Sequence, residues 1–343
     1  MPITTLLDIA GRSADIMEKT VVEGVVPENT FLSKMPVKVI SGTSYKYPVR
    51  TGVPKIRPRS YNAGVEPVKT SRSTKQAECY AYDGAIVVDK ALVDGEADGA
   101  SYIEDEANVI AGAAFFGLTQ DVIYGVSKGN LEIPGLINQL GDYMTISNDP
   151  AHNTEETRTE GGTSVYALKL KPEDMHLLMG NNRTISFGAT RVQDIPALTD
   201  DGKDGTMEAY IKHCTFHAGF VLKNQLAAGR LCNITSANPL TDEGLLKLVE
   251  AFDTFNTPTA LVMNRFAAGQ LRRARTAAMK FGKGDGSTVA GAVTDFDGIP
   301  IIITDAILND ETTANIAAAQ AAVDMKLTDR LNKQNLKNNK KLK

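Results

Sequence analysis

The alternation of apolar and polar residues predicts a long two-stranded hairpin near the start of the chain. Val37 and Val39, then Tyr45 and Tyr47, alternate with polar or basic residues, which is the period of a β-strand. A second strand-like run covers 77–92, and the segment between the runs holds three prolines and no apolar face. Because an isolated hairpin is marginal in water, we expect this one to lie on another copy of the chain.

The clearest helix is predicted over 97–126. Its apolar residues recur at steps of four or three and form one stripe: Ile103, Ala107, Ile110, Ala114, Leu118 and Val122. Gly125 lies past the last of them, where helices commonly end. At a rise of about 1.5 Å per residue the helix spans roughly 40 Å, which suits a structural spine.

The predicted secondary structure of the remaining chain changes after Pro239. Residues 163–236 read mostly as strands, and from Thr241, a predicted N-cap, helices alternate with strands. A second helix is predicted to begin at Asn264 and to run through Met279. We expect an α/β unit of roughly 75 residues, distinct from the β-rich part before it. A short amphipathic helix is predicted over 3–19, and the fold class is α+β.

Charge is distributed unevenly along the chain. Residues 37–75 hold one acid and nine bases: Lys38, Lys46, Arg50, Lys55, Arg57, Arg59, Lys69, Arg72 and Lys75. Residues 76–125 hold ten acids and one base, and we expect an acidic partner face from Glu96, Asp98, Glu104, Asp105 and Glu106. The basic ribbon of one subunit would then lie over the acidic face of its neighbour. Two separately solvated charge runs are the alternative.

The overall composition narrows the function classes. The net charge of −4 gives no global reason to expect binding to nucleic acid or a membrane. Three cysteines form no disulfide framework and suit a reducing compartment. No signal peptide and no apolar stretch of about 20 residues is visible, and four histidines leave few candidates for catalysis.

Two segments suggest metal or nucleotide chemistry but match no motif. "KHCTFH" brings together His213, Cys214 and His217, yet a strand places the cysteine on the opposite face from both histidines. "GKGDGS" at 282–287 has its lysine too early for a phosphate-binding loop. We therefore expect no metal site, no cofactor and no catalytic residue.

The stretch "FDGIPIIITDAILNDE" over 296–311 carries the strongest candidate for chemistry. Asp295, Asp297 and Asp305 could hold Mg²⁺ or Ca²⁺, but their spacing matches no cation loop. The alternative is structural: a turn at Gly298, a strand opened by Pro300 with Ile301 to Ile303 in the core, and Asp305 capping a short helix.

The ordered set of segments resembles the major capsid proteins of tailed double-stranded DNA phages, which have the Hong Kong 97-like fold. "GFVLKNQLAAGRLCNIT" over 219–235 is similar to a β-stretch of that family. "FDGIPIIITDAILNDE" is similar to its signature, which here includes Gly298, Pro300, Asp305 and Asn309. Both segments resemble a podovirus-type branch, in which the β segment of the P-domain precedes the A-domain.

The resemblance implies a division of the chain into five parts. These are an N-terminal arm (1–36), an E-loop (37–92), a P-domain (93–236) with its spine helix (97–126), an A-domain (237–312) and a basic C-terminal tail (313–343). It also implies a structural protein and not an enzyme, which assembles through pentamers and hexamers into an icosahedral head around double-stranded DNA.

The implied partners are other copies of the chain, a separate scaffolding protein, a portal and a cement protein. DNA would be enclosed without sequence-specific binding, no membrane is involved, and the virion head would assemble in the cytoplasm of a host bacterium. Lys55 and Lys69 are available for covalent cross-linking, which we do not expect. The alternatives are an encapsulin-like nanocompartment shell, a soluble metal-dependent α/β enzyme, and a tail or decoration protein.

Overall fold

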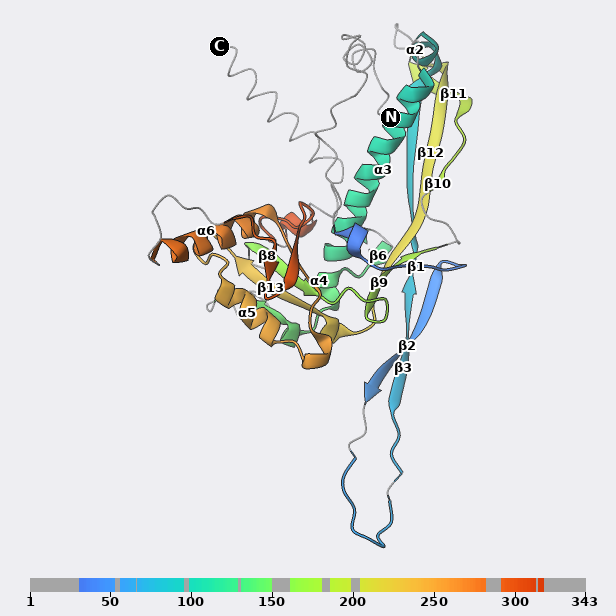
Figure 1. Cartoon of the computed structure of the whole chain (residues 1–343). Helices are drawn as coiled ribbons and strands as arrows, with labels where there is room; N and C mark the ends of the chain where they lie inside the picture. Colours follow the sequence, from blue (N-terminus) through green and yellow to red (C-terminus); the bar gives the residue numbers. More distant parts are fainter. Residues whose placement is uncertain are drawn as a thin grey trace.

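A long limb and a broader α/β part form the described chain, with a hairpin extending from one end of the limb (Figure 1). The computed structural model describes residues 31–52, 56–65, 67–95, 99–128, 131–149, 161–180, 186–198, 204–281, 291–312 and 314–317. The helix predicted over 3–19 and most of the predicted basic tail lie outside these ranges. Within them, no helix is long and apolar enough to cross a membrane.

The limb is built on β12 (Asp204–Leu222), a strand of 19 residues. Four strands pair with it in antiparallel orientation: β4 (Tyr80–Asp89), β9 (Met175–Met179), β10 (Ser186–Phe187) and β11 (Arg191–Leu198). The short β1 (Val37–Val39) joins the far side of β9 in parallel. The "KHCTFH" segment lies within β12, with Cys214 buried and His213 exposed, so the predicted strand is confirmed.

The predicted spine helix is confirmed as α3 (Gly99–Tyr124), which runs along β4 and β12 (Figure 1). Its stripe faces inward, since Ile103, Ala107, Leu118 and Val122 are buried. The short α2 (Lys90–Gly95) precedes it, and its Val93 packs in the same apolar cluster as Ile103 and Ala107. The stripe therefore holds the helix on the limb sheet along most of its length.

Gly125 ends α3 in the left-handed region, at φ 77°. A Cβ atom placed there would lie 2.4 Å from the carbonyl oxygen of Ile133. The following ribbon, β5 (Val126–Lys128) with β6 (Leu131–Ile133), turns back against the end of the helix. Only glycine allows this close return of the chain.

We expect Gly125→Ala to lower the free energy of unfolding by about 1–3 kcal/mol, because it adds left-handed strain and a backbone clash. Chemical denaturation of the unassembled subunit measures the change. Gly42→Ala is the matched control, since a Cβ there meets no atom within 4 Å. Equal midpoints for the two variants would contradict the explanation.

The α/β part holds a second sheet in the order β15-β16-β14-β8-β13-β7. These strands are β7 (Thr145–Ser147), β8 (Thr163–Leu168), β13 (Ala228–Ile234), β14 (Ala260–Met263), β15 (Asp295–Phe296) and β16 (Ile299–Ile303). All six residues of β8 are buried. One face packs against α5 (Asp242–Glu250) and α6 (Arg265–Phe281), and the other against the end of α3 and α4 (Leu136–Gln139).

Both predicted helix starts after Pro239 are confirmed. The Oγ1 atom of Thr241 accepts a hydrogen bond from the backbone N–H of Gly244 at 3.3 Å. The Oδ1 atom of Asn264 accepts one from Ala267 at 2.8 Å. The α/β unit predicted after Pro239 shares its sheet with the earlier part of the chain, because β8 lies between β13 and β14.

The stretch 296–311 differs in part from its predicted structure. Asp297 and Gly298 have positive φ (50° and 73°) and form the tight turn between β15 and β16, as predicted. Pro300 lies in β16 opposite Asp295. Ile302 is buried, but Ile303 is 41% exposed, so the expectation that the whole isoleucine run fills the core is wrong.

The predicted cap at Asp305 is also wrong. The Oγ1 atom of Thr304 accepts the hydrogen bond from the N–H of Ala306 at 3.2 Å, while Asp305 is exposed and a turn replaces the expected helix. Asn309 accepts a hydrogen bond from the side chain of Asn264 at 2.9 Å, and so ties the turn to the start of α6. In the described residues no group of three or more His, Cys, Asp or Glu could hold a metal ion.

Candidate subunit interface

The hairpin consists of β2 (Ser44–Gly52) and β3 (Ser71–Glu78) in antiparallel register. The second strand begins earlier than the sequence predicted, and most of the predicted run 77–92 forms β4 of the limb sheet instead. Tyr47 and Cys79 pack against Leu178 and Val221 at the base of the hairpin. This packing fixes the direction in which the hairpin leaves the limb.

The far part of the hairpin exposes large apolar side chains to an unusual degree. Tyr61 is 100% exposed, Ile56 84% and Val65 73%. A turn from Ser60 to Ala63, with Asn62 at φ 64°, reverses the chain there. Large apolar side chains that are this exposed on one segment make it a candidate interaction site.

The predicted basic residues fall into three groups. Those on the hairpin strands are exposed at Lys46, Arg72 and Lys75, and those on the tip are exposed at Arg57, Arg59 and Lys69. Lys38 lies apart in β1, where its Nζ donates to the hydroxyl of Tyr45 at 2.8 Å and lowers the pKa of that tyrosine. Arg50 lies in β2 opposite Arg72 of β3. Lys55 lies outside the described residues.

The predicted acidic residues gather at the start of α3. Glu104 is exposed, Asp105 and Glu106 are half-buried, and Glu96 and Asp98 lie outside the described residues. Other acids of the same block serve the subunit itself. Asp94 accepts a hydrogen bond from Tyr210. Asp121 is bound by the hydroxyl of Tyr82, and burial raises the pKa of this carboxyl to about 6.

The basic hairpin and the acidic start of α3 lie at opposite ends of the limb (Figure 1). A hairpin that extends away from the helix cannot fold back onto its own acidic residues. Any pairing between the two regions therefore joins different subunits. Exposed apolar residues among the tip charges add a nonpolar component to such a contact.

A buried polar network joins the limb to the α/β part, and no motif in the sequence predicts it. The Arg230 Nη2 atom lies 2.7 Å from Glu311 Oε2, and both side chains are almost fully buried. The hydroxyl of Tyr124, the last residue of α3, donates to Glu311 Oε1 at 2.7 Å and accepts from the N–H of Leu308 at 2.8 Å. Ser164 of β8 bonds to both charged partners. Burial and Glu311 raise the pKa of Tyr124, which therefore stays a donor.

Comparisons with known proteins agree with this architecture. Residues 13–315 match the family described as "Major capsid protein GP7". No curated protein matches the chain. A structure of bacteriophage Epsilon15 is similar over 91% of this chain and 97% of that chain, with 19% identity and a TM-score of 0.65. A structure of the bacteriophage JBD30 capsid is similar over 88% and 99%, with 12% identity and a TM-score of 0.50. The Hong Kong 97-like fold predicted from the sequence is confirmed.

Proposed function

Since the chain belongs to the Major capsid protein GP7 family, it is a structural subunit of a phage head and not an enzyme, and we propose that its hairpin joins neighbouring subunits. The basic hairpin of one subunit lies over the acidic start of α3 of the next. Membership of this family sets aside the nanocompartment, tail-protein and metal-enzyme alternatives.

The observation that carries the proposal is the separation of the two charged regions. The exposed apolar and basic residues at the hairpin tip lie at the opposite end of the molecule from the described acidic residues at the start of α3 (Figure 1). Each exposed ion pair contributes only about 0–1 kcal/mol. Repetition around a closed shell makes many such contacts act together, because each further contact is effectively intramolecular.

The boundaries of the parts of the chain follow from its resemblance to Hong Kong 97-like capsid proteins. We place the arm at 1–36, the E-loop at 37–92, the P-domain at 93–236, the A-domain at 237–312 and the tail at 313–343. The A-domain sheet also takes up β7, β8 and β13 from the preceding part of the chain. The chain falls in the podovirus-type branch, and its shell encloses double-stranded DNA without reading its sequence.

The partners that we propose beyond the chain itself are a separate scaffolding protein, a portal and a cement protein. Pentamers and hexamers of the chain build the shell. Assembly takes place in the cytoplasm of the bacterial host.

Thiol cross-linking tests the hairpin contact directly. A Tyr61→Cys and Glu104→Cys double variant, assembled into particles and treated with a short bis-maleimide, should give covalent oligomers in a denaturing gel. The three native cysteines are buried, which limits background reaction. Tyr61→Cys combined with Leu246→Cys on α5 is the matched control and should stay monomeric. Particles that yield no oligomers from the first pair would refute the proposed contact.

A further inference from the structure

Phe255 projects from the α/β part with 91% of its surface exposed. It lies in η5 (Thr254–Asn256), a single turn in the connection between α5 and β14. Exposure of a whole phenyl ring contributes nothing to the stability of the isolated subunit. Exposed aromatic residues are the side chains that most often anchor protein interfaces.

Side chains of Lys169 and Asn224 hold the turn that presents Phe255. The Nζ atom of Lys169 donates to the carbonyl oxygen of Phe255 at 3.0 Å and forms an ion pair with Asp174 at 2.9 Å. The amide of Asn224 donates to Asn256 at 2.9 Å and to Asp174 at 3.1 Å. Lys169 and Asp174 are both nearly buried, so the backbone that carries the phenyl ring is held in place.

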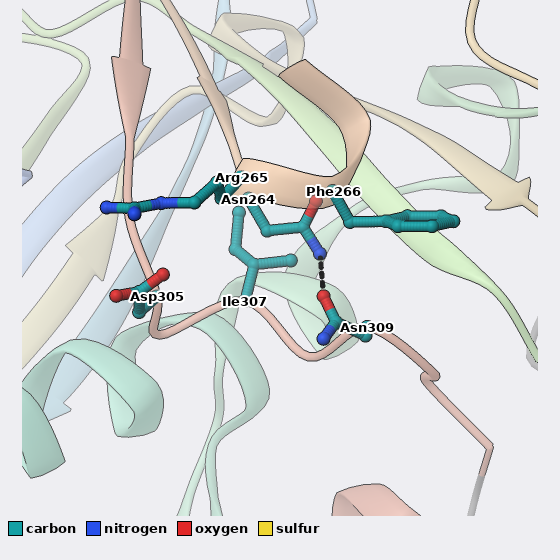
Figure 2. Close-up of a pocket in the computed structure, with 6 residues that line it drawn as sticks. All are labelled: Asn264, Arg265, Phe266, Asp305, Ile307 and Asn309. Atoms are coloured by element: carbon teal, nitrogen blue, oxygen red, sulfur yellow. Dashed lines mark hydrogen bonds between the residues drawn. The ribbon is translucent and has the colours of Figure 1, made fainter. Parts of the chain in front are cut away.

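A pocket of about 330 Å³ lies at the start of α6. Figure 2 shows Arg265 and Asp305 toward one end, Phe266 pointing toward the other, and Ile307 between them. Asn264 and Asn309, already bonded to each other, complete the lining. A cavity of about 150 Å³ can hold a benzene ring, so this pocket has room for a phenyl side chain. Arg265 and Phe266 are side chains that interact favourably with an aromatic ring.

The exposed ring and the pocket lie at opposite ends of one strand. Phe255 precedes the first residue of β14, and Arg265 and Phe266 follow its last residue. The segment with Asp305 and Ile307 follows β16, which is parallel to β14, and so reaches the same edge as α6. A projection at one edge and a cavity at the other are the elements of a head-to-tail contact, which closes into rings when the rotation between copies allows it.

Charge supports the same pairing. Asp253, beside Phe255, is exposed, and so is Arg265 at the pocket. Neither forms an ion pair within the part of the chain that the structure describes. Asp253 lies two residues from Phe255, and Arg265 lines the pocket, so a ring that enters the pocket of a second copy would bring these opposite charges into the same contact.

We propose that Phe255 of each subunit inserts into the pocket between α6 and the segment after β16 of the next subunit, and that this contact closes the rings of the shell. The proposal rests on the shell function stated above. It is independent of the hairpin, whose tip lies away from the α/β part (Figure 1).

Particle assembly by the full chain tests the contact. Phe255→Ala should lower the yield of sedimenting particles at least tenfold, whereas Phe255→Tyr, which keeps the ring, should retain most of it. The unfolding midpoint of the unassembled subunit should stay unchanged, because the side chain is exposed. Wild-type yield from Phe255→Ala would overturn the proposal. It would not bear on the hairpin contact, which the thiol cross-linking experiment tests separately.

A charge exchange identifies the occupant of the pocket. Asp253→Arg and Arg265→Asp should each reduce assembly, and the double variant should recover it. Aspartate at the first residue of α6 is compatible with the helix dipole, so Arg265→Asp should fold normally. Failure of the double variant to recover, with Phe255→Ala defective, would mean that another protein binds Phe255, and it would overturn the proposal as well.

Discussion

Glu311→Gln will destabilise the subunit by about 3–5 kcal/mol, the cost of removing one partner from a buried ion pair. The variant keeps the shape of the side chain but leaves the charge of Arg230 buried without its counterion, which lies 2.7 Å away in the native subunit. It also weakens the acceptor of the Tyr124 hydroxyl. Since Tyr124 ends α3 and Arg230 lies in β13, the substitution loosens the junction between the limb and the α/β part.

Chemical denaturation of the unassembled subunit measures this effect. Glu243→Gln is the matched control, because Glu243 makes the same kind of ion pair with Lys247 at 2.9 Å but on the surface of α5. Its unfolding midpoint should equal that of the wild type. A Glu311→Gln subunit as stable as this control would show that the buried network does not hold the junction.

Reversing the charge of the hairpin tip will prevent assembly. Arg57→Glu, Arg59→Glu and Lys69→Glu together place three acids where the proposed contact brings Glu104 of the neighbouring α3, and like charges brought together at an interface cost several kcal/mol. Because the contact recurs in every subunit, particle yield should fall at least tenfold. Sedimentation and electron microscopy measure the yield, and the unfolding midpoint of the subunit should not change, since these side chains are exposed.

The reciprocal change separates charge pairing from loss of the tip itself. Glu104→Lys in the same chain should restore part of the yield, whereas Lys247→Glu on the distant α5 should restore none. Wild-type assembly should weaken as salt rises, because the screening length falls from about 10 Å at 0.1 M to about 3 Å at 1 M. Full assembly by the triple variant would contradict a role for the basic tip.

The elements that the sequence predicted correctly are those with a local signal. The stripe of α3 repeats within the helix, the caps at Thr241 and Asn264 act on N–H groups three residues away, and the turn at Asp297 and Gly298 is formed by those two residues. The basic ribbon and the acidic block are likewise visible in the order of residues alone. These features depend on neighbours in the chain, and the amino-acid pattern therefore determines them.

The predicted cap at Asp305 failed although the N–H group that it was expected to bind is close by in the chain. The hydroxyl of Thr304 took the capping role expected of Asp305, because the fold and not residue type decides which side chain faces the free N–H.

The sequence by itself determined the elements of this subunit, its charge blocks and its similarity to phage capsid proteins. Tertiary structure alone decided which strands share a sheet, where β8 sits, and how Tyr124 and Arg230 reach Glu311 from 187 and 81 residues away. It also decided that Phe255 faces outward on a braced turn. The physical reason is that hydrogen bonds, ion pairs and burial between distant segments leave no periodic trace in either segment.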